Sequence, residues 1–293
     1  MKRVFSIKII LVVVSFAFGL TLFGQNDSIT FMDAKWKTKR VSKGLKYSSF
    51  HFKGNLFASN QFVSILSIDP NMVKIDIVAD TVLKPTSEFF SQSKALAAVN
   101  GSFFDMAKKK RPYNSVVYIR VDGEEIAPNQ LNGNNGRGFH QQGAISVFRD
   151  IPYILKSDNS YNWEDFIESE DVITTGPLLK IDGELESLSQ HPFNKNRHPR
   201  TVVAKVSDDL VYLIVVDGRS SESAGMSLFE VQQMLNWLGA KDAINLDGGG
   251  SSTMCVKSGP RGNKVVNHPS DNKKFDNFGE RNVANAIIVS KKH

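Results

Sequence analysis

A carboxylate followed by three consecutive glycines ends an apolar segment of this chain, in the run Asn245–Thr253 (NLDGGGSST). Because glycine has no Cβ, the backbone can turn sharply there and approach a bound group closely. Successive backbone amides in such a turn can also form a concave anion-binding nest. The run is typical either of a tight structural turn or of an anion cradle beside Asp247. The second interpretation points to a phosphate-bearing substrate.

The first residues have the pattern of a secretory signal peptide, which we place at residues 1–24. Lys2, Arg3 and Lys8 surround the start of an apolar run over Ile9–Phe23, and polar sequence follows Gly24. The run is shorter than the roughly 18 to 20 apolar residues that a spanning helix needs. We therefore expect an exported protein, periplasmic or extracellular, with no membrane span after cleavage. An uncleaved anchor is the alternative.

Cysteine content and charge narrow the possibilities further. The only cysteine, Cys255, lies far from the leader, which excludes a lipid anchor on an N-terminal cysteine and any intrachain disulfide. Without its three leader cations the chain has 33 Lys and Arg against 30 Asp and Glu, a net charge of +3. No long basic stripe with interleaved aromatic residues is present, and Lys108–Arg111 is typical of a solvated loop. We expect no nucleic-acid partner.

The pattern of apolar residues predicts many short strands and few helices. We expect a mixed α/β (α+β) fold with residues 25–94 as a β-rich portion packed on a catalytic core at 95–293. Ser227 and Glu230 form a capping-box pattern for one helix that ends near Gly239. The Gly- and Asn-rich segment Asp122–Gly143 is typical of a long exposed loop. The predicted strands are Phe62–Ile68, Val73–Ala79, Ala95–Val99, Ser115–Val121, Ala144–Phe148, Val202–Val206, Leu210–Val216, Ala243–Leu246 and Ala284–Val289.

A strand, helix, strand order in the C-terminal half predicts a βαβ crossover within a mixed sheet. The strand at Leu210–Val216 ends at Asp217, and the strand at Ala243–Leu246 ends at Asp247. Such a crossover is normally right-handed with parallel strands, so both carboxylates would emerge at one sheet edge. Strands that are immediate neighbours lie about 4.8 Å apart.

Glycoside hydrolases generally use two carboxyl groups that lie close together in the active site. The two groups are about 5 to 5.5 Å apart in retaining enzymes and about 6.5 to 9.5 Å apart in inverting ones. Asp before Gly also commonly closes a turn. Asp217 and Asp247 are therefore either a catalytic pair or two turn residues.

Several motifs occur together in an order that resembles the phosphodiester glycosidase family. The resemblance covers roughly residues 69–289, and Ser102 stands where many relatives have glycine. The motifs are Asn100–Asp105 (NGSFFD), Thr175–Pro177 (TGP), His198–Thr201 (HPRT), Asp217–Arg219 (DGR), Asn245–Ser251 (NLDGGGS) and Glu280–Asn285 (ERNVAN).

The resemblance implies hydrolysis of a sugar-1-phosphate diester or of a phosphorylated glycan, to free sugar and phosphomonoester. Asp247 is the first candidate for nucleophile or general base, with Asp217 as its partner. Arg200 has a planar cationic fork suited to phosphate, and Arg219 or Arg281 would complete the clamp. The amides of the three glycines would stabilise the leaving phosphate.

Other motif residues are candidates for substrate binding. Asn100 would bind a sugar hydroxyl, and Phe103 or Phe104 would stack on a pyranose ring or pack in the core. Asp105 would bind substrate or a cation, or close a turn. His198 would transfer a proton or be structural. The expected substrate-binding set is Asn100, Phe104, Asp105, Thr175, Gly176, Arg200, Arg219, Gly248, Gly249, Gly250, Ser251 and Arg281.

Two functions of other classes stay open. A serine hydrolase would use Ser251 with His198 and Asp217, although the run lacks the G-x-S-x-G pattern. A non-catalytic protein would bind anionic cell-surface glycans through its arginines and aromatic residues. We expect no required cofactor. A divalent cation such as calcium is possible, although neither EF-hand spacing nor a zinc signature is present.

Overall fold

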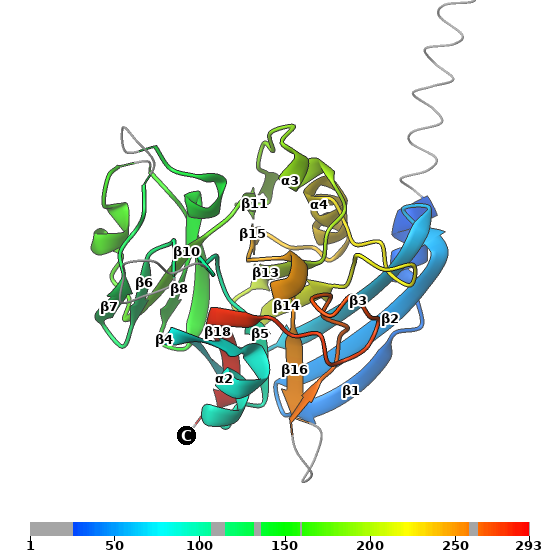
Figure 1. Ribbon diagram of the computed structural model, residues 1–293, viewed down its shortest axis with the longest axis horizontal. Helices are drawn as coiled ribbons and strands as arrows, with labels where there is room; N and C mark the ends of the chain where they lie inside the picture. The colour runs from blue at the N-terminus through cyan, green and yellow to red at the C-terminus, as the bar shows by residue number, and fades with distance from the viewer. Residues whose placement is uncertain (1–25, 107–114, 132–135, 159, 258–262, 293) are drawn as a thin grey trace, which may run out of the picture.

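The computed structural model describes residues 26–106, 115–131, 136–158, 160–257 and 263–292. The predicted signal peptide and the predicted solvated loop Lys108–Arg111 lie outside these ranges. Strands form three antiparallel sheets and are the main regular structure of the described chain, and the prediction of few helices is confirmed (Figure 1). No helix in the described ranges has both the length and the apolar content to cross a bilayer.

The largest sheet has eight strands and combines the N-terminal strands with those of the C-terminal half. Its order is β1-β2-β3-β14-β13-β15-β11-β12. The strands are β1 (Lys37–Ser42), β2 (Leu45–Leu56), β3 (Ser59–Ile68), β14 (Leu210–Val216), β13 (Arg200–Ser207), β15 (Asp242–Asn245), β11 (Leu178–Ile181) and β12 (Glu184–Leu185).

Two five-stranded sheets pack against it. One has the order β7-β6-β10-β8-β9, with β7 (Glu124–Ala127), β6 (Ile119–Val121), β10 (Asp171–Thr175), β8 (Gly143–Phe148) and β9 (Ile151–Lys156). The other has the order β17-β16-β5-β18-β4, with β17 (Asn263–Val265), β16 (Met254–Lys257), β5 (Ala97–Asn100), β18 (Asn282–Lys291) and β4 (Val73–Pro85).

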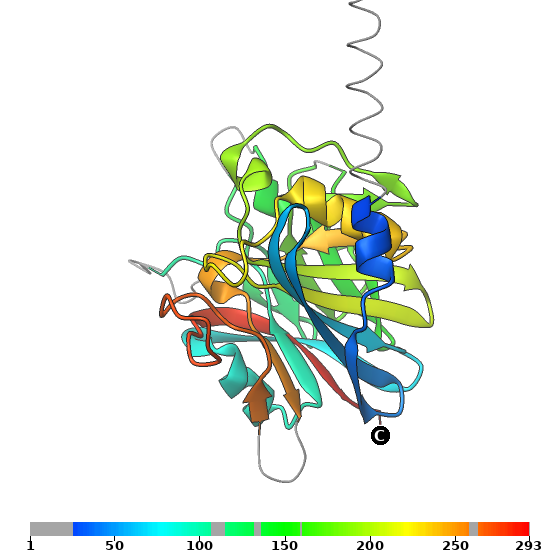
Figure 2. The same cartoon turned by 90° about the vertical axis from the view of Figure 1, so that its right-hand side faces the viewer.

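The helices are short and occupy the edges and one outer face of the sheets. They are α2 (Thr86–Gln92), α3 (Pro192–Lys195) and α4 (Leu228–Trp237), with 3-10 turns η2 (Phe139–Gln141), η3 (Trp163–Phe166) and η4 (Gly249–Ser251). Residues 26–32 are also helical. Figure 2 shows this N-terminal helix and α4 on the same face of the eight-stranded sheet.

Strand β14 is apolar along its length because both of its faces are buried. Leu213 and Val215 belong to the large apolar core shared by the three sheets. Ile214 and Val216 face the other way, into the layer formed with α4. Successive side chains of a strand point to opposite faces, so a strand buried on both sides needs a continuous apolar run.

Helix α4 begins as the sequence predicts. The Ser227 hydroxyl accepts the backbone N–H of Glu230 at 3.2 Å, and the Glu230 carboxylate accepts the backbone N–H of Ser227 at 2.8 Å. The predicted capping box is thus confirmed. Gly239, just beyond the helix, has φ +71°, a conformation that suits glycine at a helix end.

The predicted pair of neighbouring parallel strands is not what the structure shows. Strand β13 lies between β14 and β15 and pairs antiparallel with both. β14 and β15 therefore run in the same direction but two positions apart, about 10 Å. The reason is that β13 and β14 form a local hairpin, and β15 then adds to the free side of β13.

The sequence prediction also missed regular structure within the segment expected as a loop. The segment expected as one long loop, Asp122–Gly143, contains β7 and η2, and only its residues 132–135 lie outside the described chain. The N-terminal portion is built into the sheets themselves, since β3 pairs with β14 and β4 pairs with β18.

We expect Phe52→Ala to lower the free energy of unfolding by about 3 to 5 kcal/mol, because it empties a buried site. The Phe52 ring is fully buried and packs between Phe31, Trp36 and Phe50. Urea denaturation measures the change. Phe278→Ala is the matched control, since that ring is 87% exposed. Equal, small effects of the two substitutions would contradict this packing.

Candidate active site

Asp247 stands at the point where β15 ends and the glycine run begins. Its backbone N–H donates to the carbonyl of Gly101 at 3.1 Å, and its own carbonyl accepts the Asn100 side-chain amide at 2.8 Å. Asn100 is fully buried, and its Oδ1 accepts Thr201 Oγ1 at 2.7 Å and the Thr253 N–H at 3.1 Å. Asn100 therefore fixes the backbone under Asp247, instead of facing a sugar as we expected.

The amides of the glycine run are largely used within the chain. The Gly248 N–H donates to Oδ1 of Asp247 at 2.9 Å, and the Gly249 N–H donates to the Pro199 carbonyl at 2.9 Å. The expected nest for a leaving phosphate is thus partly occupied by the carboxylate of Asp247 itself. The glycines serve a different purpose, which is to make room for two cations.

Two arginines lie directly against the glycine run. A Cβ added at Gly249 would be 2.8 Å from Nη2 of Arg219, and one added at Gly250 would be 2.5 Å from Nη2 of Arg281. Real Cβ contacts are not that short, so any larger residue would displace a guanidinium. The absence of a Cβ at Gly249 and Gly250 is therefore what brings Arg219 and Arg281 into the vicinity of Asp247.

The two guanidinium groups are held differently. Arg281 Nη2 pairs with Oδ1 of Asp271 at 2.6 Å, and this same carboxylate oxygen lies over Gly250. Arg219 is exposed and has a left-handed backbone with φ +64°. One cation is thus oriented by a partner, and the other stays open to solvent.

The environment of Asp247 shifts its titration toward neutral pH. Burial raises the pKa of its carboxyl to about 6. The Ser251 hydroxyl, the Gly248 N–H, Arg281 and Arg219 act in the opposite direction and stabilise the charged form. The carboxyl is therefore largely ionised at pH 7 and becomes protonated as the pH falls through about 6.

The Asp217 carboxylate accepts hydrogen bonds from residues of its own chain. Its side chain is buried, Oδ1 accepts the Asn267 side-chain amide at 2.9 Å, and Oδ2 accepts both Nδ1 of His268 at 2.7 Å and the His268 backbone N–H at 2.9 Å. With β13 between their strands, Asp217 and Asp247 do not lie at the ends of neighbouring strands, and their predicted action as a catalytic pair stays a prediction. The triad Ser251, His198, Asp217 is not assembled either, because the histidine on Asp217 is His268.

Arg200 is also placed differently from the prediction. It is fully buried, and its guanidinium donates to the backbone carbonyls of Met226 at 2.9 Å, Phe193 at 2.6 Å and Asn196 at 3.0 Å. Burial lowers the pKa of Arg200 to about 9, against the opposing effect of Glu230. Arg200 therefore ties down the loop before β13 and is not an open phosphate clamp.

The Thr175–Gly176 turn is hydrogen-bonded to Asn245 at the end of β15. Thr175 Oγ1 donates to the Asn245 carbonyl at 2.8 Å, and the Asn245 side-chain amide donates to the Gly176 carbonyl at 2.9 Å. Thr175 is fully buried. These residues position the strand that carries Asp247 and have no side chain directed at a substrate.

The two phenylalanines of the Asn100–Asp105 motif have different surroundings. Phe104 packs with the buried apolar cluster of Phe89, Val283 and Ala286, so the expected stacking role does not fit it. The Phe103 ring instead lies 5.7 Å from the ring of Phe139. Asp105 follows as a half-buried residue that has interactions of its own.

Phe103 belongs to an aromatic wall that it forms with residues of η2 and α3. Phe139 stacks on Phe193 with ring centroids 4.6 Å apart, and His140 lies 5.6 Å from Phe103. Phe139 is partly exposed, so its ring is accessible from solvent. Sequence analysis missed Phe139, His140, Phe193 and Asp271 because none stands in a recognisable motif, and their proximity arises only from folding.

His198 lies among the cations of the site. Burial lowers the pKa of its imidazole, with Arg200 and Arg219 acting in the same direction. Its backbone is held by a bridge to Met226. His198 is consequently neutral at pH 7. Within the described ranges, no three His, Cys, Asp or Glu side chains gather as a metal site.

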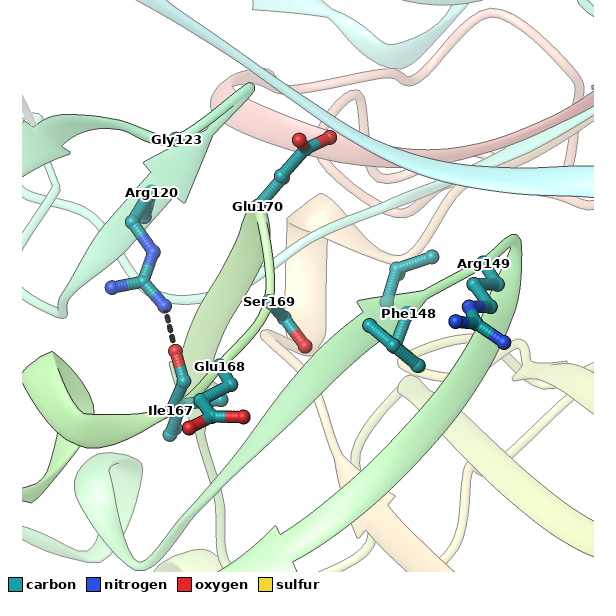
Figure 3. Close-up of a pocket in the computed structure, with 9 residues that line it drawn as sticks. Arg120, Gly123, Phe148, Arg149, Ile167, Glu168, Ser169 and Glu170 are labelled. Carbon is teal, nitrogen blue, oxygen red and sulfur yellow. Dashed lines mark hydrogen bonds between the residues drawn. The ribbon is translucent and has the colours of Figure 1, made fainter.

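A separate cavity of about 560 Å³ opens on the sheet that contains β10 (Figure 3). It is lined by Arg120, Arg149, Phe148, Glu168 and Glu170 among others, and Arg120 donates to the Ile167 carbonyl. None of the motif residues lines this cavity. The candidate site is therefore the region around Asp247.

The chain is similar to several known proteins. The phosphodiester glycosidase family matches residues 93–290. The SPbeta prophage-derived uncharacterized protein YomE of Bacillus subtilis (strain 168) is 33% identical over 94 residues. That alignment covers 32% of this chain and only 13% of YomE, so the chain spans a small part of that relative.

Two solved structures share the fold. The zebrafish N-acetylglucosamine-1-phosphodiester alpha-N-acetylglucosaminidase catalytic domain, auto-inhibited by its pro-peptide, superposes with TM-score 0.61 at 18% identity, covering 88% of this chain and 89% of that one. A hypothetical protein from Synechocystis gives TM-score 0.62 at 15% identity, covering 88% of this chain and 64% of that one. At these identities the likeness establishes the fold alone.

We expect Arg219→Ala to raise the pKa of Asp247 above its value of about 6, because it removes a cation that stabilises the carboxylate. Carbon-detected NMR titration of the Asp247 carboxyl measures the shift. Arg40→Ala, an exposed arginine on β1, is the control and should leave the pKa unchanged. An unchanged pKa in Arg219→Ala would show that this guanidinium does not act on Asp247.

Proposed function

The chain belongs to the phosphodiester glycosidase family, and from that premise we propose that it is a hydrolase of sugar-1-phosphate diesters. The products are a free sugar and a phosphomonoester. The observation that carries the proposal is one titratable carboxylate, Asp247, beside two arginines that lie on consecutive glycines. A carboxylate suits the sugar carbon, and guanidinium groups suit the phosphate.

The charged groups of the site contact different parts of the substrate. Arg219 and Arg281 contact the phosphate and neutralise the charge that it gains as the bond to the sugar breaks. Asp247 then faces the anomeric carbon, either as a nucleophile or as the base that activates a water molecule. The aromatic wall of Phe103, Phe139 and Phe193 provides surfaces for a sugar ring.

This arrangement reduces the need for a second carboxylic acid. A phosphomonoester leaves more readily than an alkoxide, so strong protonation of the leaving oxygen is less important. Two guanidinium groups stabilise the departing charge instead. Asp217 then serves as a structural residue. Asp271 acts on the reaction through Arg281, whose guanidinium it orients.

The ionisation of Asp247 sets the direction of the pH dependence. Its pKa is about 6, so the charged form that attacks or accepts a proton decreases as the pH falls through that value. The elevated pKa also makes the carboxylate a stronger base than an ordinary aspartate. A chain that uses Asp247 in this way is active at neutral pH and loses activity in acid.

We expect Asp247→Asn to lower kcat/KM by roughly 10³-fold, within the range that loss of a general base or nucleophile produces. Release of free sugar from a panel of sugar-1-phosphate diesters measures the change and identifies the preferred sugar. Asp217→Asn should keep most of its activity per folded molecule, because Asp217 does not face the substrate. Asp271→Asn should mainly raise KM, since Arg281 loses its partner.

The three Asp→Asn variants distinguish the possible outcomes. Near-wild-type turnover by folded Asp247→Asn would remove Asp247 from the mechanism. A loss of activity in folded Asp217→Asn equal to that in Asp247→Asn would restore the predicted carboxylate pair. Tight glycan binding without sugar release by the native protein would favour the non-catalytic binder.

We also propose that the protein is exported. The support is the cationic start and the apolar run Ile9–Phe23, which lie outside the described chain. In a bacterial host, N-terminal sequencing of the tagged protein should give a start near residue 25 in the exported fraction. Recovery of an intact N-terminus, retained in the cytosol, would contradict export.

A further inference from the structure

A groove of about 660 Å³ lies on the N-terminal strands, apart from the glycine run. Its wall carries three lysines, Lys37, Lys39 and Lys53, and two histidines, His51 and His268. The remaining lining residues are Tyr47, Ser49, Phe50, Phe62, Val256, Val265, Val266 and Asn277, so no carboxylate of the described residues lines it. A concave surface with charge of one sign concentrates an oppositely charged ligand.

The register of the strands brings these cations onto one face. Lys37 lies opposite Ser49, and Lys39 lies opposite Tyr47, in the pairing of β1 with β2. Side chains directly opposite each other in an antiparallel pair point to the same face. Alternation along β2 adds Lys53 to that face. None of these three lysines forms an ion pair within the described chain, so their charges are available to a ligand.

The far end of the groove is rigid and aromatic. The His268 ring stacks on Phe275 with centroids 3.7 Å apart, and Phe62 meets it edge-on at 4.7 Å. Because the Asp217 carboxylate accepts from Nδ1, that nitrogen of His268 carries a proton, and Nε2 is the ring atom left for another partner. His51 is held by the Glu222 carbonyl at 2.8 Å.

The same end of the groove is joined to the candidate active site through the chain. Asp217, which fixes His268, stands two residues before Arg219. His268 itself stands three residues before Asp271, the partner of Arg281. Asp217 is therefore close in sequence to one of the two arginines beside Asp247, and His268 is close in sequence to the partner of the other.

We propose that this groove binds a polyanionic aglycone, a chain that carries further phosphate groups beyond the one at the scissile bond. The inference rests on the proposed function for the identity of the ligand. Lysine ammonium groups are flexible point charges that suit phosphates at variable spacing. Phe62 and Tyr47 provide apolar surface for the segments between the charges. Lys37, Lys39 and Lys53 lie outside the family-matched residues 93–290, whereas His268 lies within them, so the groove joins the N-terminal strands to the family-matched part of the chain.

Binding of linear inorganic polyphosphate, followed by isothermal titration calorimetry, tests the groove separately from catalysis. We expect the double variant Lys37→Ala, Lys39→Ala to weaken binding roughly fivefold to tenfold, as loss of two exposed ion pairs would do. The matched control is Lys43→Ala, Lys46→Ala, which removes the same charge. Lys46 lies opposite Arg40 on the other face of the strands, and Lys43 is at the turn.

Three binding results would overturn the proposal. The native protein would fail to bind polyphosphate, both double variants would weaken binding equally, or Arg219→Ala alone would abolish binding. The last result would place the ligand at the active site. Phe50 and Phe62 are left intact, so the variants test charge without disturbing the packing of the groove.

A kinetic measurement separates this inference from the proposed function. For a diester whose aglycone carries a second phosphate, the Lys37→Ala, Lys39→Ala variant should have a KM roughly fivefold higher, while a neutral short aglycone shows no change. Sugar release without that difference in KM would contradict the proposed role of the groove and would still support the proposed hydrolase activity. Polyphosphate binding that depends on the groove lysines, without any sugar release, would support the proposed role of the groove and contradict the proposed hydrolase activity.

Discussion

The close approach of two guanidinium groups to the backbone at Gly249 and Gly250 is the constraint on which the site depends. A single added Cβ would meet Arg219 or Arg281 within 2.8 Å. With glycine at both positions, two cations reach the region of a carboxylate whose pKa burial raises to about 6. The cations limit that rise by favouring the charged form, so the carboxyl titrates near neutral pH and stays usable as a base.

Buried amide side chains hold this loop where three sheets meet. Asn100 at the end of β5 binds Thr201, Thr253 and the carbonyl of Asp247, and Asn245 joins β15 to the Gly176 turn. Buried polar groups are costly unless they are paired, and paired networks rigidify their surroundings. Asn100 and Asn245 therefore hold the backbone that carries Asp247.

The two aspartates that the sequence presents as equivalents have opposite environments. Asp217 is saturated with donors from Asn267 and His268 and anchors the wall of a cationic groove. Asp247 receives one backbone N–H and faces cations. A carboxylate that accepts several hydrogen bonds within the chain is held in place, whereas one with fewer donors and cations beside it keeps oxygens open to a ligand. In the proposed mechanism Asp217 therefore supports the structure, while Asp247 reacts with the substrate.

The sequence by itself determined the local features that depend only on residues close to one another in the chain. The run Leu210–Val216, the capping box of Ser227 and Glu230, and the glycine turn after Asp247 were all predictable, because strand alternation, helix capping and glycine's missing Cβ act over a few residues. Only the tertiary structure decided that β13 separates β14 from β15, that Arg200 is buried, and that the lysines of β1 face His268. These depend on which distant strands pair, and pairing energy is spread over many contacts that no single segment contains.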